Sequence, residues 1–181
     1  MSKPTAITPG MWIVSSDAHW PTTSRETLAA MLDFIARNAS KIVGYVDLGD
    51  TFDNSSIAHH NKGKALFQVP GSFKTETDSF RREFLGPLER ALPKGCKKVM
   101  ITGNHTRFES DYIEVHPELA GVVDRFEALG LRRKGWQIVP LGMSYQIGKL
   151  TCIHGDQLGG PFGGSVKLAS IVLSHQPGER R

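Results

Sequence analysis

The sequence is poor in the features that define several protein classes. Its 181 residues include only two cysteines, Cys96 and Cys152, which excludes a disulfide framework and favours reduced thiols. No apolar run approaches the roughly 18 residues of a membrane-spanning helix, so we expect no membrane partner. The first ten residues lack the apolar core of a signal peptide, which predicts a cytoplasmic protein.

The composition is otherwise that of an ordinary globular protein. Hydrophobic residues make up 39% and charged residues 22% of the chain, and its length predicts a single domain spanning residues 1–181. The net charge of +4 is spread along the chain, with short basic clusters at 97–98 and 132–134. Scattered positive charge is weak support for a polyanionic partner, so nucleic acid stays one candidate among several.

Apolar residues alternate between two periodicities along most of the chain. Strand-like runs occupy 11–16, 41–49 and 97–103, whereas helical spacing marks 24–39 and 117–130. Strands that alternate with helices are typical of an α/β fold with a parallel sheet.

A further helical region is expected between the second and third strands. Phe80, Phe84 and Leu88 lie at helical spacing and would form one apolar face. Gly86-Pro87 falls inside this region and is expected to break or kink the helix.

The pattern changes after the last of these helices. Three short strand-like runs follow at 136–142, 143–148 and 150–155, separated by tight turns, and they predict an antiparallel meander. An alternating β/α region followed by a run of strands predicts a layered α/β sandwich with room for two sheets.

Polar side chains follow each apolar run where the expected strand ends. Because the carboxyl ends of parallel strands meet in one crevice, these side chains are expected to converge. Their oxygen and nitrogen donors suit Mn²⁺, Fe or Zn²⁺ better than a thiolate site would. The residues concerned are Asp17, His19, Asp50, Asp53, Asn104, His105, His154 and Asp156.

Four of these strand ends carry recognisable motifs. They read D-x-H at 17–19, G-D-x-x-D at 49–53, G-N-H at 103–105 and H-G at 154–155. In this order the sequence resembles the calcineurin-like metallophosphoesterases, and more narrowly their phage and bacterial branch. The resemblance spans Trp12 to Gly155 and implies a layered α-β-β-α sandwich whose second sheet is incomplete in this chain.

The resemblance also implies a role for each matching residue. Two divalent ions would be bound, Mn²⁺ in first place and Fe or Zn²⁺ as the other options. His105 would face the scissile phosphate as general acid, Asp53 would orient a ligating imidazole, and Arg107 would contact the substrate. The metal ligands would be Asp17 and His19 for the first ion, Asn104 and His154 for the second, and Asp50 for both.

Such a centre has a physical logic of its own. Two divalent ions about 3.5–4 Å apart can clamp a phosphoryl group and lower the pKa of a bridging water to near neutrality. The expected function is therefore metal-dependent hydrolysis of a phosphomonoester or phosphodiester by a hydroxide that both ions activate. The alternative is a non-catalytic domain that binds phosphate or nucleic acid and retains a degenerate metal site.

The sequence departs from the family at two places. Thr106 stands where an acidic residue usually follows G-N-H. The family's closing G-H-x-H is replaced by Ser174-His175-Gln176-Pro177, in which His175 is the candidate ligand of the second ion. Either the tail has diverged, or the chain is truncated before a motif beyond Arg181, and its activity is then expected to be impaired.

His59 and His60 follow the second motif. Adjacent residues of an extended chain point in opposite directions, so both cannot ligate one ion. A solvated loop is the preferred interpretation of this pair, with substrate contact as the alternative.

Overall fold

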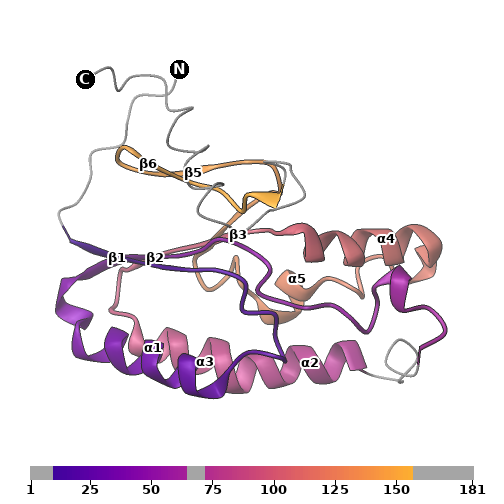
Figure 1. Ribbon diagram of the computed structural model, residues 1–181, viewed down its shortest axis with the longest axis horizontal. Helices are drawn as coiled ribbons and strands as arrows, with labels where there is room; N and C mark the ends of the chain where they lie inside the picture. Colours follow the sequence, from indigo (N-terminus) through magenta and orange to yellow (C-terminus); the bar gives the residue numbers. More distant parts are fainter. Residues whose placement is uncertain (1–9, 65–71, 157–181) are drawn as a thin grey trace.

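The computed structural model describes residues 10–64 and 72–156, whose elements alternate strands with helices (Figure 1). Shorter turns of 3₁₀-helix occur at Ala39–Lys41, His59–Asn61, Asn104–Thr106 and Pro117–Leu119. The strands and helices are, in chain order, β1 (Met11–Ser15), α1 (Arg25–Arg37), β2 (Ile42–Asp47), α2 (Ser72–Phe80), α3 (Gly86–Ala91), β3 (Lys97–Ile101), α4 (Arg107–Val115), α5 (Arg125–Leu129), β4 (Trp136–Val139), β5 (Tyr145–Ile147) and β6 (Leu150–Cys152).

Four strands form a parallel sheet in the order β1-β2-β3-β4. Val46 in β2 pairs with Val14 in β1 and with Val99 in β3, which pairs in turn with Gln137 in β4. The predicted strands at 11–16, 41–49 and 97–103 are therefore confirmed, and the fold is mixed α/β.

The predicted meander is wrong in its first strand. β4 joins the parallel sheet instead, because α5 precedes it and a helical crossover brings the chain back in the same direction. The antiparallel pairing in this region is that of β5 with β6, with Tyr145 opposite Cys152.

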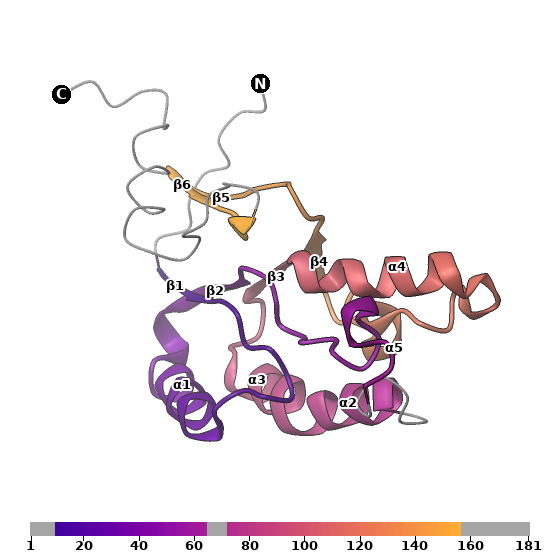
Figure 2. The same cartoon turned by 45° about the vertical axis from the view of Figure 1, so that its right-hand side comes forward.

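One face of the parallel sheet packs against a layer of helices. Figures 1 and 2 show α1, α2 and α3 on this side of the sheet. Strand residues such as Tyr45, Met100 and Trp136 meet helix residues such as Ile35 and Leu88, and all five are buried. This cluster is the main core, and it fixes the sheet against the helices by apolar burial.

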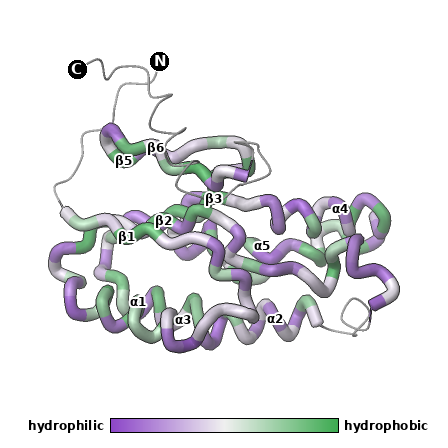
Figure 3. The backbone as a smooth tube through the Cα atoms, viewed as in Figure 1, coloured by the Kyte–Doolittle hydropathy of each residue, from purple (hydrophilic) through white to green (hydrophobic). Residues whose placement is uncertain are grey.

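The other face of the sheet packs against the β5–β6 hairpin (Figure 1). Val46, Val99, Ile101 and Val139 form its apolar surface, together with Cys152 of β6. In Figure 3 the β1–β2 part of the sheet is coloured as hydrophobic, whereas hydrophilic stretches occur in the segments that lead toward α4. The apolar strands therefore give way to polar segments at the end of the sheet where the predicted site lies.

The helix predicted for 117–130 is much shorter in the structure. The chain forms a 3₁₀ turn, passes through Gly121 at a φ of 80°, and becomes α-helical only after Asp124. Asp124 caps α5 by accepting the N–H of Glu127 at 2.9 Å. The predicted end at Gly130 is confirmed, since Gly130 adopts the left-handed conformation of a C-terminal cap.

The predicted interruption before Pro87 takes the form of a π-helical turn. Arg81–Leu85 adopts this wider turn between α2 and α3, and the N–H of Gly86 bonds to the carbonyl of Arg81, five residues earlier. Pro87 lacks an N–H and its ring crowds the preceding turn, which explains why the regular hydrogen-bond ladder changes here. The helical path nevertheless continues into α3.

Within residues 10–64 and 72–156, no helix combines the length and the hydrophobicity that crossing a bilayer requires.

Candidate metal centre

The segments that follow β1 and β2 run side by side beyond the sheet. The N–H of Asp17 donates to the carbonyl of Gly49, and the N–H of His19 donates to the carbonyl of Asp50, both at 2.9 Å. These hydrogen bonds extend the strand pairing past Ser15 and bring the D-x-H and G-D-x-x-D motifs together.

The backbone of these motifs adopts an uncommon conformation. Asp17, His19 and Asp50 have positive φ angles of 54°, 46° and 49°. Among the described residues only one other non-glycine residue has a positive φ, namely Asn54, which directly follows the G-D-x-x-D motif. Positive φ is unfavourable for residues with a side chain, and its concentration here points to a functional constraint on side-chain direction.

Two glycines permit close approaches that any side chain would prevent. A Cβ atom at Gly103 would overlap the carboxylate of Asp50, and one at Gly49 would lie 2.7 Å from Nδ1 of His154. The glycines of the G-D and G-N-H motifs therefore let the three segments meet.

Two groups of potential metal ligands share the carboxylate of Asp50. Asp17, Asp50 and His154 each offer a ligand atom within 4.8 Å of the others, and so do His19, Asp50 and His105. The amide oxygen of Asn104 lies 2.9 Å from Nε2 of His154, so this side chain joins the first group. The structure thus brings the expected ligands of the four motifs together, but it groups Asp17 with His154 and not with His19 alone. Asp17 Oδ1 lies 3.7 Å from Nε2 of His19, so that expected pair is also adjacent.

The tautomer of His154 makes it suitable for binding a cation. Its Nδ1 lies 3.0 Å from the carbonyl oxygen of Leu48, which can only accept, so Nδ1 carries a proton. Its Nε2 lies 3.2 Å from Asp50 Oδ2 as well as near Asn104 Oδ1. Two oxygens that face Nε2 require either a proton or a metal ion between them, so these residues fit a divalent cation.

The same contacts set the ionisation of His154 and Asp50 without a metal, when a proton lies between them. Its hydrogen bond to Asp50 is the main reason that the pKa of His154 is raised. Burial would raise the pKa of Asp50, but hydrogen bonds from His154 and from the backbone N–H of His105 outweigh it and lower the pKa. Asp50 is therefore a carboxylate at neutral pH, as a bridging ligand must be.

Asp53 contacts both of the imidazoles that lie beside Asp50. Its carboxylate is 3.4 Å from Nδ1 of His19 and 3.7 Å from Nδ1 of His105, and its backbone carbonyl lies 2.6 Å from the same His105 atom. The Ser55 hydroxyl donates to that carboxylate and helps to hold it. Because Nδ1 of His105 is hydrogen-bonded to Asp53, Nε2 is the ring nitrogen that is available for proton transfer.

The remaining predicted residues lie outside this cluster. Arg107 is exposed at the first turn of α4, next to the G-N-H motif. Asp156 is exposed at the end of the described chain. His175 lies outside the described residues.

Asp47 is a buried residue of the site region that the motif analysis missed. Its carboxylate accepts hydrogen bonds from the N–H of Gly49 at 2.9 Å and from the Thr51 hydroxyl at 2.8 Å. Burial raises the pKa of Asp47 to about 6 in spite of these bonds. These hydrogen bonds fix the turn that carries Asp50. The sequence feature that could have identified Asp47 is an acidic residue at the end of an apolar strand.

A buried polar network behind His105 was also missed. Asn54 donates through Nδ2 to the carbonyl of His105 at 3.0 Å and to Glu109 at 3.2 Å. Arg125, fully buried in α5, donates to Asn54 Oδ1 at 2.8 Å and to Glu76 at 3.1 Å. The backbone that carries His105 is thus tied to three helices.

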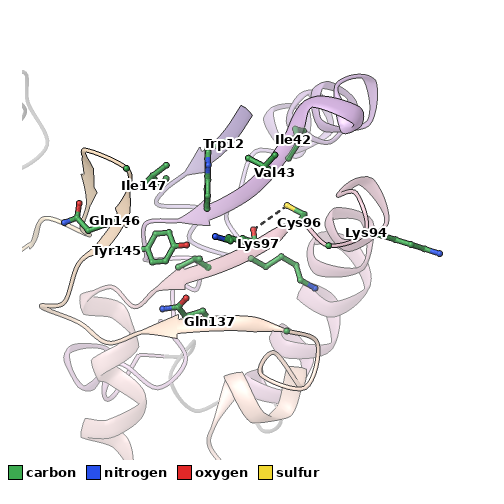
Figure 4. Close-up of a pocket in the computed structure, with 15 residues that line it drawn as sticks. Trp12, Ile42, Val43, Lys94, Cys96, Lys97, Gln137, Tyr145, Gln146 and Ile147 are labelled. Atoms are coloured by element: carbon green, nitrogen blue, oxygen red, sulfur yellow. Dashed lines mark hydrogen bonds between the residues drawn. The ribbon is translucent and has the colours of Figure 1, made fainter. Parts of the chain in front are cut away.

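A cavity of about 670 Å³ lies elsewhere, between the parallel sheet and the hairpin (Figure 4). Trp12, Gln137 and Tyr145 line it, and Figure 4 shows Lys94 pointing away from it. Its described lining contains no Asp, Glu or His, so it offers no carboxylate or imidazole for acid–base chemistry, and Cys96 is its one thiol. Among the described residues, the potential metal ligands that the motifs predicted lie at the strand ends and not in this cavity.

Comparisons with known proteins add no identification. Neither a scan against protein-family models nor a search of curated proteins found a match to this chain.

Proposed function

We propose that this protein is a divalent-metal-dependent phosphoesterase similar to the calcineurin-like metallophosphoesterases. The observation that carries the proposal is the buried carboxylate of Asp50, which both groups of potential metal ligands share. A shared, buried carboxylate between two donor sets is what a two-ion centre requires. The order of the four motifs along the chain also supports the phosphoesterase proposal.

In this proposal the ligands divide between two ions. Asp17 and His19, which are 3.7 Å apart, would hold the first, and Asn104 and His154, which are 2.9 Å apart, would hold the second. Asp50 would serve both, and His105 would bind neither. Mn²⁺ suits this mixture of carboxylate, amide and imidazole, and Fe or Zn²⁺ are the other candidates. When bound, the ions supply positive charge for the phosphoryl oxygens and acidify a water molecule for attack on phosphorus.

The protein's own groups complete the reaction. Asn104 is neutral, so it preserves the positive charge of the centre where a carboxylate would reduce it. His105, with Nδ1 held by Asp53, presents Nε2 to the leaving oxygen and gives it a proton. Arg107, which is exposed at the start of α4, would contact a substrate phosphate.

The proposed family also completes the description of the fold. The helix layer, the parallel sheet and the β5–β6 hairpin correspond to three layers of an α-β-β-α sandwich. We assign the hairpin to the second sheet of that sandwich.

Metal content and hydrolysis test the proposal together. The protein, loaded with Mn²⁺ and dialysed, is expected to hold two ions per chain by elemental analysis and to hydrolyse bis-p-nitrophenyl phosphate or p-nitrophenyl phosphate. Asp50→Asn is expected to lose at least one ion and all hydrolysis, whereas the exposed Asp33→Asn on α1 keeps both. Wild-type stoichiometry in Asp50→Asn would contradict the bridging role. One ion or none, with no hydrolysis by the wild type, would instead support a non-catalytic binding domain.

A further inference from the structure

A continuous series of rings leads away from the metal centre. His19 contacts His105 with ring centroids 4.6 Å apart, and His105 contacts Phe108 at 5.0 Å. Phe108 contacts His60 at 5.3 Å, and His60 contacts His59 at 5.7 Å. We call His105, Phe108, His60 and His59 the ring strip.

The ring strip joins two segments that are far apart in sequence. Phe108 is the second residue of α4, whereas His59 and His60 belong to a 3₁₀ turn in the loop after β2. Asn61 anchors this turn, since it is buried and donates through Nδ2 to the carbonyl of Ser55 at 2.9 Å. The preferred interpretation of a merely solvated histidine pair is therefore incomplete, because His60 packs against Phe108.

The outer part of the ring strip is open to solvent. His59 and His60 are exposed and Phe108 is half-buried. The neighbouring cations Arg107 and Lys62 are exposed too, and no ion pair of either is found within residues 10–64 and 72–156. Aromatic surface that starts at the His105 ring and lies beside unpaired cations is the combination that binds a nucleobase and its phosphates.

We propose that the ring strip binds the nucleobase next to the scissile phosphate, so that the substrate is a phosphodiester of single-stranded nucleic acid. This inference rests on the proposed phosphoesterase function and specifies its substrate. Unpaired bases offer their faces for stacking on Phe108 and His60, whereas bases in a duplex are already stacked on each other. Arg107 and Lys62 contact the flanking phosphates, which adds a salt-dependent contribution to binding.

Binding without hydrolysis gives the first test. In EDTA, fluorescence anisotropy compares a labelled decathymidylate with an abasic oligomer of the same length and charge. The thymidylate is expected to bind about 5-fold to 150-fold more tightly, the range of one stacked base. Phe108→Leu and His60→Ala should each reduce that ratio toward one, and His60→Ala changes an exposed loop residue that does not threaten folding.

A matched substitution separates stacking from general effects. Phe34→Leu makes the same chemical change at an exposed position of α1 and should leave the ratio as in the wild type. Equal affinity of the wild type for both oligomers would overturn the inference. A ratio that Phe108→Leu and His60→Ala both leave intact would overturn it as well.

Hydrolysis with Mn²⁺ gives the second test and separates the two proposals. Thymidine 5′-(p-nitrophenyl phosphate) and methyl p-nitrophenyl phosphate share a phosphodiester and a leaving group and differ in the nucleoside. A higher kcat/KM for the nucleoside ester, carried by KM and reduced in Phe108→Leu, supports the inference. Equal kcat/KM values for the two esters would refute base binding by the ring strip and leave the phosphoesterase proposal standing. Hydrolysis of neither ester, and none of the monoester p-nitrophenyl phosphate, would refute the phosphoesterase. Base-dependent binding in EDTA would then leave the ring strip as a nucleic-acid-binding surface.

Discussion

Two clusters of buried charge lie on either side of His105, and they are built differently. In the first, Arg125 is fully buried and lies between Glu76 and Glu109, at 3.1 Å and 3.4 Å. In the second, Asp17, Asp50 and His154 converge from three segments, and the Asp17 side chain is 57% exposed. One cluster is closed and the other opens to solvent.

The difference lies in where the positive charge comes from. The closed cluster contains its own permanent cation, which the rings of Phe52 and Phe73 also flank at 4.8 Å and 4.2 Å. The open cluster gathers carboxylate, amide and imidazole atoms, and its histidines offer positive charge only when protonated. A cluster of lone pairs without a permanent cation is built to receive one from solution, whereas the Arg125 cluster serves the fold.

Asn54 connects the two clusters. It accepts from Arg125 and donates to the carbonyl of His105, so the closed cluster holds the backbone from which His105 reaches the open one. The comparison therefore predicts that substitutions in the open cluster reduce turnover, and that those in the closed cluster reduce stability.

The largest effect is expected for His105→Ala. Loss of the proposed general acid should slow hydrolysis of an alkyl phosphodiester by about 10²–10⁴-fold, and much less for a p-nitrophenyl ester, whose leaving group needs little protonation. Metal content should be retained, and the free energy of unfolding should change by about 1 kcal/mol. His116→Ala is the control, at a half-buried position that follows α4. Equal losses on both esters would remove the general-acid role.

Removal of Arg125 should give the next largest effect. Arg125→Ala leaves the buried carboxylate of Glu109 without its cation, and urea unfolding should show a loss of about 3–5 kcal/mol. Arg132→Ala, which breaks an exposed pair with Glu127, should cost at most about 1 kcal/mol. A small loss at Arg125 would show that the closed cluster does not stabilise the fold as argued.

Metal ions should stabilise the protein through the open cluster alone. At a free Mn²⁺ concentration 1,000 times the Kd of one of the two sites, filling that site should raise the free energy of unfolding by about 4 kcal/mol. Asp50→Asn should lose most of this increment, whereas Glu109→Gln, in the closed cluster, should retain it. A loss of the increment in Glu109→Gln would show that the two clusters are energetically coupled.

The smallest effect concerns the pH dependence that Asp47 introduces. Because its pKa is raised to about 6 in the folded state, the native protein binds this proton more tightly than the unfolded chain does. The contribution of Asp47 to the free energy of unfolding therefore falls as the pH rises from about 4 to 6. Asp47→Asn should escape that fall and gain, relative to wild type, up to about 3 kcal/mol by pH 7 in EDTA. A stability difference that is constant from pH 4 to pH 7 would contradict the role of burial.

The sequence predicted the open cluster better than the closed one. Each ligand of the open cluster follows an apolar run, and parallel strands bring their ends together whatever the details of packing. Arg125 and Asn54 are hydrogen-bonded although they are far apart in the sequence. No local sequence pattern predicts such a contact. The polar partners of a buried arginine depend on how helices pack, which residue spacing does not encode.

The same distinction applies to the fold. Strands 11–16, 41–49 and 97–103 were predictable because each is an apolar run bounded by polar residues. The strand that pairs with β4 was not predictable. Whether β4 joins a meander or the edge of the parallel sheet depends on the crossover through α5. That helix was misjudged because a glycine at positive φ, Gly121, interrupts its apolar periodicity.

The position of the ligands along the chain has a consequence for folding. Asp17 follows the first strand of the described chain and His154 follows the last, so two ions that share Asp50 would act together as a reversible cross-link between these segments. A cross-link that closes a long loop lowers the entropy of the unfolded chain more than one that closes a short loop. Metal release would then loosen the attachment of the hairpin segment to the parallel sheet, and metal affinity would report whether both ends of the described chain are in place.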